Sequence, residues 1–462
     1  MTNVGEVDGL TLFPADAGYR AAVEVFNLAA PVRPAAAVTA RTVGQVRAAI
    51  LDARRRGWHV RVHSTGHGSA AARPVDGGLL IRTRLTGGVS IDPLARVARV
   101  PAGTRWGEVA QAAAAYGLAA PHGSSPTVGV VGYLLRGGVS FYGRQVGLAG
   151  NRVRAVELVT ADGEYRRVDA DNDPELFHAL RGGGGGFGVV TAVEVALHPV
   201  AAVVTGAAFW PAAHAPALLD AWRGWTRHAP DRATTTFRVM NLPAIEGVIP
   251  SALSAGTVVC VDGAVLAATA DELPDAQRVA DELLGPLRAV APTIQDSWTT
   301  AGPIDVLATH LDPAEPVPLV GDHMLLDELD ESGAAAFLAS VGPDSGSPLI
   351  NAELRQLGGA LAVPDPDGGI LDHLPARYAY VSGGMPFGLV TVDDIRGHCA
   401  TVRRTLTPWN TGRTAPTFVE TVDQPQLHLD ADQVAVVDRV RRRVDPDDLF
   451  RLDVAPNASA VR

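Results

Sequence analysis

The hydrophobic pattern of the first 200 residues predicts alternating strands and helices. Between residues 35 and 60 it predicts a strand, a helix that ends at Gly57 and a second strand; the helical spacing is seen at Val43, Val46, Ile50 and Ala53. Further on it predicts two short strands and a helix, at 79–83, 98–100 and 106–114.

A hairpin and a capped helix are predicted next. An Asp-Gly pair separates two alternating stretches within 155–168, which is a strong hairpin signal. An aspartate and a proline at 173–174 then open a short helix. The glycines at 182–188 follow this helix and precede a strand at 189–193, whereas a dinucleotide fingerprint needs a strand, then glycines, then a helix. The Rossmann interpretation is therefore rejected.

The pattern beyond residue 200 predicts a second domain. Residues 204–410 mix strands with helices such as 275–284, which indicates an α+β domain with an antiparallel sheet. A helix at 431–443 and a turn at 445–450 follow, and the apolar end of that turn predicts docking onto the first domain. We expect a first domain, a second domain and a C-terminal segment that returns to the first, at 1–203, 204–410 and 411–462.

Composition and charge narrow the class of protein. A chain of 462 residues with 47% hydrophobic and 19% charged residues can form two or three cores. All 39 residues counted as Lys or Arg are arginine, and with the abundant Ala, Gly and Val this indicates a GC-rich, bacterial source. The formal net charge of -11 argues against nucleic-acid binding. The arginine clusters at 54–56 and 441–443 are expected at solvated helix ends.

The positions of the cysteines and the lengths of the apolar runs argue against a disulfide framework, a metal site and a membrane span. Cys260 and Cys399 are far apart, so neither a disulfide framework nor a metal site is expected. Residues 1–6 lack a basic stretch before an apolar core, and no apolar run approaches about 18 residues, the length of a membrane span. We expect a cytoplasmic protein without a membrane or nucleic-acid partner; the sequence does not predict its oligomeric state.

Two glycine-rich stretches carry the candidate chemistry. In the stretch 61–69, glycines without a Cβ allow backbone N–H groups to approach an anion such as a phosphate closely. His67 stands between two glycines and is expected to be unshielded, although an isolated histidine of this kind is more often a surface residue or one whose hydrogen bonds are satisfied. The stretch 123–150 suits a backbone wrapped around an extended ligand; the alternative is a flexible surface loop.

Six sequence words, in this order, resemble the berberine bridge enzyme-like branch of the vanillyl-alcohol oxidase flavoproteins, which bind FAD in a PCMH-type domain. They are Thr-Gly-His-Gly at 65–68 and the segments 123–129, 149–153, 174–185, 187–191 and 444–450. The resemblance covers 35–200 and 405–452 and is weaker in between. It implies an α+β fold: a PCMH-type FAD-binding domain plus an antiparallel-sheet substrate domain with helices on one face.

The resemblance also implies where FAD binds. The 61–69 loop holds the pyrophosphate, and His67 matches a histidine linked covalently to the flavin 8α-methyl group. The implied cofactor-binding residues are His63, Ser64, Thr65, Gly66, His67, Gly68, Ser69, Ser124, Ser125, Thr127, Val128, Gly129, Gly132, Gly137, Gly138, Gly188, Val190 and Asp453. Ser125 stands where some members use a cysteine for a second flavin link, so the single-link branch is expected.

Three departures from the family words bear on catalysis. Arg136 replaces the first glycine of Leu-Gly-Gly-Gly, which places a large cation beside the expected flavin loop. Ala-Pro-Thr-Phe at 415–418 replaces Tyr-x-Asn-Phe, and Asp453 replaces an asparagine. Without that tyrosine the base is unassigned; the candidates are His310, Glu353, His373, Tyr378 and Glu420.

Glu353 and Arg355 form a further candidate pair. They are two residues apart, so on a strand they share one face. There they either orient a polar or acidic substrate or form an exposed salt bridge on the outer face. The sequence leaves both alternatives open.

Three functions are compatible with the resemblance. The first is an FAD-dependent oxidase of a small organic molecule in bacterial secondary metabolism, with hydride transfer to flavin N5 and reoxidation by O2. The second is an FAD-containing tailoring enzyme that catalyses a non-oxidative cyclisation or pericyclic reaction by orientation alone. The third is a catalytically silent, FAD-stabilised binding protein. Flavin bleaching with peroxide formation separates the first from the others.

Overall fold

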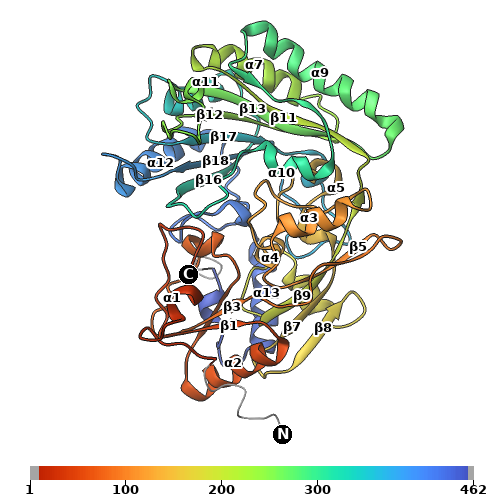
Figure 1. Cartoon of the computed structure of the whole chain (residues 1–462), viewed down its shortest axis with the longest axis vertical. Coiled ribbons are helices and arrows are strands. Elements are labelled where there is room, and N and C mark those ends of the chain that lie inside the picture. Colours follow the sequence, from red (N-terminus) through yellow and green to blue (C-terminus); the bar gives the residue numbers. More distant parts are fainter. Residues whose placement is uncertain (1–9, 456–462) are drawn as a thin grey trace.

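The computed structural model describes residues 10–455, so residues 1–6, on which the expectation about a leader rests, lie outside it. The chain forms two stacked lobes (Figure 1). The first lobe contains β1 to β10 and α13, and the second contains β11 to β18 with α7 to α12. Within the described part of the chain, no helix combines the length and the apolar character that a membrane crossing needs.

The first lobe contains a parallel sheet and an antiparallel sheet. The parallel sheet has the order β1-β3-β2: Ala36–Ala40, Leu79–Thr83 and Val60–His63. The antiparallel sheet has the order β4-β5-β9-β7-β8: Ser90–Asp92, Val97–Pro101, Val189–Ala196, Val153–Val159 and Tyr165–Asp169. A short pair, β6 (Leu118–Ala119) with β10 (His198–Pro199), completes its strands. Its helices are α1 (Tyr19–Ala22), α2 (Val43–Arg56), α3 (Trp106–Ala114), α4 (Val130–Leu135), α5 (Gly143–Val146) and α6 (Pro174–Leu180).

Local chemistry sets the limits of these elements. Helix α2 starts after Thr42, whose hydroxyl accepts a hydrogen bond from the Gln45 N–H. It ends at Gly57, which adopts the left-handed conformation with φ 67°. The predicted helix at 106–114 and the predicted hairpin are both present as α3 and as β7 with β8.

The glycine-rich stretch 123–150 is not a flexible surface loop. It contains α4 and α5, and residues 137–144 are all buried. Phe141 and Tyr142 belong to a hydrophobic cluster with β11 and β13 residues. The stretch therefore lies between the two lobes as part of the core.

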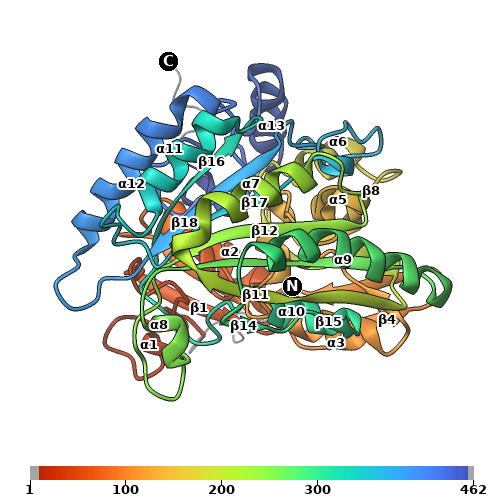
Figure 2. The ribbon, with the colours of Figure 1, turned by 90° about the horizontal axis from the view of Figure 1, so that it is seen from above.

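The second lobe is one antiparallel sheet with helices on one face (Figure 2). The strand order is β14-β11-β13-β12-β17-β18-β16, with β15 also paired to β11: Gln295–Asp296, Ala202–Pro211, Val258–Ala267, Ala233–Met240, Asn351–Gln356, Tyr378–Gly384, Val320–Leu326 and Thr299–Ala301. The helices that cover it are α7 (Ala215–Thr226), α9 (Leu273–Val290), α11 (Glu331–Val341) and α12 (Val392–Leu406). Two short helices, α8 (Ser251–Ser254) and α10 (Val306–Thr309), lie in its connections.

Strand alternation decides which side chains of this sheet face the first lobe. On β17, Ala352 and Leu354 join the core beneath the helices. Glu353 and Arg355 must then point to the opposite face. That face carries Leu325 and Ala379, which pack against first-lobe residues such as Leu148. Glu353 and Arg355 therefore point towards the first lobe.

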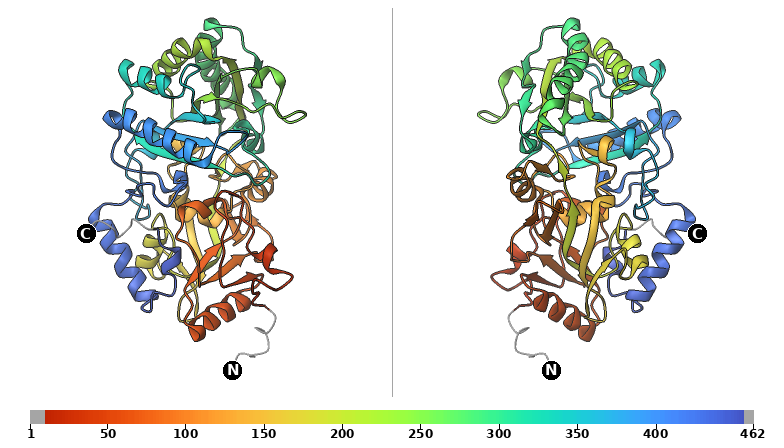
Figure 3. Two further views of the ribbon diagram at one scale, coloured as in Figure 1. Left: turned by 90° about the vertical axis from the view of Figure 1, so that its left-hand side faces the viewer. Right: turned by 90° about the vertical axis from the view of Figure 1, so that its right-hand side faces the viewer.

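The C-terminal segment returns to the first lobe. Helix α13 (Ala431–Val444) runs along its flank (Figure 3). Leu449 and Phe450 pack into the core of the parallel sheet, and the Leu449 carbonyl accepts a hydrogen bond from the Val60 N–H (2.7 Å). Docking of the tail is confirmed. The expectation that Arg441 is solvated is wrong: it is buried and donates to the carbonyls of Gly183 and Gly185.

Candidate functional site

In the loop that follows β2, two carbonyl groups are held by protein donors, whereas two N–H groups have no protein acceptor among the described residues. The carbonyls of Ser64 and Thr65 accept hydrogen bonds from Arg82 Nε (3.1 Å) and the Phe26 N–H (2.9 Å). Within the described residues, the N–H groups at 66–67 have no protein acceptor. Consecutive free N–H groups in a turn form an anion-binding concavity. The loop therefore fits the pyrophosphate that the resemblance assigns to it.

His67 is held by Phe26 and by Thr127. Its ring stacks on Phe26, with centroids 3.7 Å apart and 13° between the planes. Its Nε2 lies 3.0 Å from Thr127 Oγ1, which is 2.9 Å from Ser125 Oγ. The expectation that His67 is unshielded is therefore wrong. Burial lowers the pKa of His67 to about 4, although Asp312 opposes the shift, so the imidazole is neutral near pH 7.

The second glycine loop packs directly on the first. A Cβ on Gly129 would lie 2.2 Å from Ser64 Oγ, so only glycine permits this approach. A Cβ on Gly138 would lie 2.4 Å from Tyr133 Cε1, and Gly138 and Gly137 have positive φ angles of 68° and 83°. The remaining predicted residues of this stretch differ in exposure: half-buried Ser124, Thr127 and Val128, buried Ser125 and exposed Gly132.

Asp453 comes to the same loop from the far end of the chain. Its Oδ1 accepts a hydrogen bond from the Val62 N–H (3.4 Å), and a Cβ on Gly185 would lie 2.4 Å from its Oδ2. Burial raises the pKa of the Asp453 carboxyl. Gly188 and Val190 lie at the start of β9, where a Cβ on Gly188 would lie 2.5 Å from a backbone carbonyl oxygen.

The first loop also contains buried polar atoms that the protein leaves unsatisfied. Both ring nitrogens of His63 and the hydroxyl of Ser69 have no hydrogen-bond partner among the described residues. Burial lowers the pKa of His63 to about 3, with Arg61 and Arg82 adding to the shift, so the ring is neutral. Buried polar atoms in proteins are normally paired. Together with the free N–H groups, they fit a bound group with many donors and acceptors, such as FAD.

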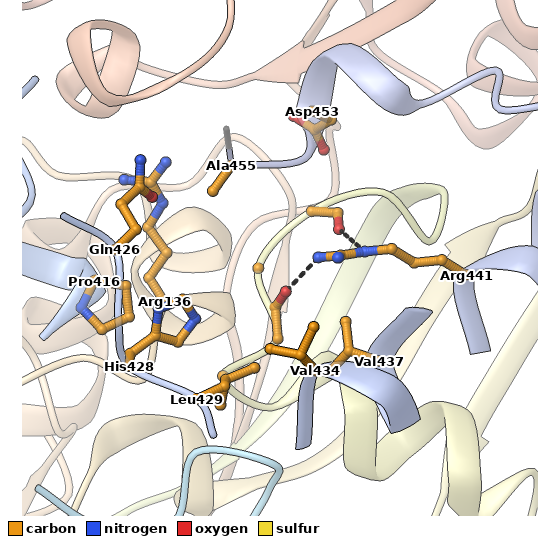
Figure 4. Close-up of a pocket in the computed structure, with 14 residues that line it drawn as sticks. Arg136, Pro416, Gln426, His428, Leu429, Val434, Val437, Arg441, Asp453 and Ala455 are labelled. Atoms are coloured by element: carbon orange, nitrogen blue, oxygen red, sulfur yellow. Dashed lines mark hydrogen bonds between the residues drawn. The ribbon is translucent and has the colours of Figure 1, made fainter. Parts of the chain in front are cut away.

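A small cavity lies between the 182–185 loop and the segment before α13 (Figure 4). Its volume is about 30 Å³, and Arg136, Gln426 and His428 line one side of it. Gln426 Nε2 and His428 Nδ1 are buried without a partner among the described residues. On the other side Arg441 donates to two carbonyls of the 182–185 loop. A cavity of this size has room for ordered water and is too small for an organic substrate.

A buried ionic cluster occupies the face of the second sheet that points towards the first lobe. His310 lies between two carboxylates, 2.9 Å from Asp262 Oδ2 and 2.9 Å from Glu353 Oε2. Arg238 pairs with Asp262 (3.1 Å), and Arg355 pairs with Glu353 (2.9 Å). Neighbouring strands bring these side chains together, because Arg238 is in register with Glu353.

The cluster carries an excess of positive charge. Burial and Arg238 lower the pKa of His310, but Asp262 and Glu353 outweigh them and raise it to about 9. Burial raises the pKa of Glu353, but Arg355 and His310 outweigh it and hold that pKa well below its usual range. Three cationic groups thus face two carboxylates.

The aromatic neighbours of Arg355 fix the direction in which the cluster faces. The Arg355 guanidinium lies 5.6 Å from the ring centre of Phe141 and 5.1 Å from that of Phe418. Phe141 belongs to the first lobe, and both Glu353 and Arg355 are buried. The alternative of an exposed salt bridge on the outer face is therefore wrong.

Two other candidate residues do not join this cluster. Tyr378 packs beneath the helices, with its hydroxyl 2.9 Å from Thr226 Oγ1 and its ring 5.5 Å from that of Trp222. It lies on the opposite face of the sheet from Glu353, since it belongs to the helix-covered core. His373 is half-buried and pairs with its neighbour Asp372 (2.7 Å).

Glu420 lies at the lobe junction, which we define by His67, Arg136, Asp312, Gly321 and Glu420. Glu420 is half-buried, and its side chain packs against Gly321 of β16. Burial raises the pKa of Glu420 to about 7; Arg136 opposes this rise and Asp312 adds to it.

Sequence reasoning missed several of these residues. Phe26 lies in an irregular segment with no periodic pattern, so nothing in the sequence indicates its contact with His67. Arg238 and Asp262 each interrupt a strand whose every residue is buried, β12 and β13. The sequence signal that could have found these two residues is a single charged residue within a buried strand. A buried charged side chain almost always has a partner.

The arrangement defines a class of protein. A parallel sheet whose β2 loop meets a glycine loop and a returning C-terminal segment, beside a large antiparallel sheet, is a PCMH-type FAD-binding fold. Residues 34–169 match the family model of the FAD binding domain.

Comparisons with known proteins agree with this class. (R)-6-hydroxynicotine oxidase of Paenarthrobacter nicotinovorans is 35% identical over 192 residues, 42% of either chain. The solved structure of BBE-like 1 of Physcomitrella patens covers 98% of both chains with a TM-score of 0.80 at 19% identity. Glucooligosaccharide oxidase of Acremonium strictum, described with a 6-S-cysteinyl, 8α-N1-histidyl FAD, also covers 98% of both, with a TM-score of 0.77 at 18% identity.

These findings confirm the resemblance drawn from the sequence. The chain carries an FAD binding domain and has the fold of the berberine bridge enzyme-like flavoproteins. It spans about half or less of the length of the curated relatives that it matches.

Proposed function

We propose that this protein is an FAD-dependent oxidase of a small organic molecule and that its flavin is linked covalently to His67. The observation that carries the proposal is the state of His67: a neutral ring with Nε2 engaged by Thr127. The hydrogen bonds that the ring forms are with the hydroxyl and the backbone of Thr127. When Nε2 carries the proton and donates it to Thr127, Nδ1 keeps a lone pair and is a nucleophile. The histidyl FAD of glucooligosaccharide oxidase supports the same linkage here.

The loops around β2 would hold the cofactor. The free N–H groups at 66–67 would bind the pyrophosphate. The polar side-chain atoms of His63 and Ser69, which have no partner among the described residues, would form hydrogen bonds with it. FAD, when bound, supplies the hydride acceptor and passes the electrons on, here to O2. The protein contributes orientation, the exclusion of water by the second lobe and a place for the substrate proton.

The ionic cluster supports a polar or acidic substrate. It faces the first lobe with an excess positive charge, and Arg355 lies between the aromatic rings of Phe141 and Phe418. A cation beside apolar rings suits a cyclic molecule that carries an anionic or strongly polar group. The proposed setting is bacterial secondary metabolism; the arginine-only, GC-rich composition supports the bacterial part.

Anaerobic reduction of the flavin tests the proposal. The holoprotein is mixed with a panel of alcohols, sugars, hydroxylated N-heterocycles and aromatic hydroxy acids, and flavin absorbance is followed. We expect one donor class to bleach the flavin, and admission of O2 to restore the colour with one peroxide formed per product. Product formation without bleaching or peroxide would replace the oxidase by the non-oxidative tailoring enzyme.

A further inference from the structure

The position of Glu420 is fixed by the second sheet. The Glu420 N–H donates to Gln424 Oε1 (2.6 Å), and Gln424 Nε2 donates to Asp322 Oδ1 on β16 (2.6 Å). A Cβ on Gly321, also on β16, would lie 3.2 Å from Glu420 Cγ, so the side chain crosses the strand at its glycine. Both the backbone and the stem of Glu420 are therefore held by β16.

The same end of β16 is connected to His67. The His67 ring stacks on Phe26, and the next residue, Asn27, exchanges two hydrogen bonds with Leu319 (2.9 and 3.2 Å). Leu319 lies two residues before Gly321, against which Glu420 packs. One short series of contacts thus holds the proposed flavin attachment point and Glu420 at the same lobe junction.

Arg136 links the two loops electrostatically. A Cβ on Gly68, the residue after His67, would lie 3.4 Å from the nearest guanidinium nitrogen of Arg136. The charge of Arg136 acts on Glu420 and lowers its pKa, whereas burial and Asp312 raise it. Within the described residues, the Arg136 guanidinium and the Glu420 carboxylate act on each other only through their charges, without a hydrogen bond or an ion pair. Neither group is therefore neutralised by a direct partner among the described residues.

Two other carboxylates of the second sheet are already paired with cations. Asp322 pairs with Arg403 and accepts from Gln424. Glu353 pairs with Arg355 and His310. A carboxylate tied to two cations is a weak proton acceptor, whereas a carboxylate that titrates near the working pH is an efficient one. This comparison favours Glu420 over Glu353 as the base.

We propose that Glu420 accepts the proton that the substrate loses on oxidation, and that Arg136 is the positioning residue that keeps its carboxylate ionised. The inference rests on the proposed oxidase function. As H–C–X–H becomes C=X, where X is oxygen or nitrogen, the X–H proton passes to a Glu420 oxygen. The C–H hydrogen leaves with its electron pair to oxidised flavin, which is the oxidant. The substrate class is therefore an alcohol or an amine with a C–H bond on the carbon that carries the group.

Four holoprotein variants test the assignment. Glu420→Gln removes the proton acceptor, Arg136→Met removes the cation and Arg136→Lys keeps it. Asp423→Asn is the matched control, since Asp423 is an exposed carboxylate three residues further along the same segment. The rate of anaerobic flavin reduction by the donor found above is measured from pH 5 to 9, and the flavin spectrum of the oxidised protein is titrated over the same range.

In the wild type we expect the reduction rate to rise through a pKa near 7 and the flavin spectrum to change in the same interval. Glu420→Gln should abolish both changes and slow reduction about 100-fold. Arg136→Met should move the rise to higher pH, Arg136→Lys should restore it, and Asp423→Asn should match the wild type. If Glu420→Gln fails to bind flavin, the Arg136→Met and Arg136→Lys comparison still decides the question.

Contrary results are distinct from a failure of the proposed function. A Glu420→Gln protein that reduces within twofold of Asp423→Asn, or that keeps the pH rise, overturns the role of Glu420. An unshifted rise in Arg136→Met overturns the role of Arg136. If no donor reduces the wild-type flavin, the oxidase function itself is wrong and the base assignment is wrong with it.

Discussion

The Nε2 atom of His67 lies 3.0 Å from the hydroxyl oxygen of Thr127, and the backbone of Thr127 also forms a hydrogen bond with the ring. Phe26 stacks on the ring and burial lowers the pKa of His67 to about 4, so the ring stays neutral and keeps one orientation. A neutral, oriented imidazole is what an alkylation at Nδ1 requires. In the proposed function, this arrangement would orient His67 for covalent attachment of the flavin.

Replacement of Thr127 tests this arrangement. Thr127→Val removes the acceptor of the Nε2 proton, and the lost hydrogen bond should slow covalent incorporation of FAD roughly tenfold. Thr127→Ser keeps the hydroxyl and should behave as the wild type. Incorporation is measured by adding FAD to flavin-free protein and following the acid-insoluble flavin with time. Equal rates in the valine and serine variants would contradict the role of Thr127.

Ser125 predicts a single flavin link. Its hydroxyl lies 2.9 Å from Thr127 Oγ1, close to His67, but a serine hydroxyl is a much weaker nucleophile than a cysteine thiolate. The tryptic peptide that contains Ser125, residues 106–136, should therefore carry no flavin mass. Flavin found on this peptide, or on peptides with Cys260 or Cys399, would overturn the single-link prediction.

The ionic cluster predicts slower oxidation when its polarity is changed. Glu353→Gln and Arg355→Met should each slow flavin reduction by roughly tenfold or more without altering the flavin spectrum, because a substrate group would lose its oriented partner. Removing one member of a buried ion pair also destabilises a protein by about 3–5 kcal/mol. The thermal unfolding of each variant must therefore be measured together with its kinetics. The double variant Glu353→Gln, Arg355→Met removes both members of this pair, so neither is left buried without the other.

Two matched controls belong to this experiment. Tyr378→Phe and His373→Gln change candidates that the structure places outside the cluster, so the reduction rate should stay within about twofold, a change worth well under 1 kcal/mol in the barrier. If these two variants slow reduction and the cluster variants do not, substrate contacts lie elsewhere on the second lobe.

The raised pKa of Glu420 predicts a pH-dependent stability difference. Burial raises this pKa from 4.5 to about 7. Because the folded-state pKa exceeds the unfolded one, the stabilising contribution of Glu420 is complete below about pH 4.5 and is lost as the pH rises through 7. The side chain introduced by Glu420→Gln is uncharged at every pH. The variant should therefore have the melting temperature of the wild type near pH 4 and a higher one at pH 8. Its unfolding free energy at pH 8 should exceed that of the wild type by at most about 3 kcal/mol. A difference that does not change with pH would refute the raised pKa.

Local signals allowed much of the fold to be predicted from the sequence. The helix at 106–114 begins where the Arg105 N–H bonds to the Glu108 carboxylate, and the 155–168 hairpin turns at its Asp-Gly pair. These interactions span a few residues, so the sequence displays them directly. The division of the chain near residues 203 and 410 stays a prediction.

Contacts between residues on distant strands could not be predicted from local sequence signals. Asp262 and Glu353 both bond to His310, yet they lie on different strands, and only the register of β12 with β13 and β17 brings them together. The stacking of Phe26 on His67 joins an irregular segment to a loop. Residues 123–150 were open to interpretation as a loop, because many glycines weaken a helical pattern even where tertiary packing buries the chain.

Mass spectrometry of one tryptic peptide tests the central claim most directly. Trypsin cleaves poorly at Arg73-Pro74, so residues 62–82 are released as one peptide that contains both His63 and His67. From holoprotein precipitated in acid, we predict that this peptide carries the flavin and that its fragments place it on His67. His67→Ala should release all flavin to the supernatant. Flavin that is released entirely from the wild type, or found on His63, would contradict the account.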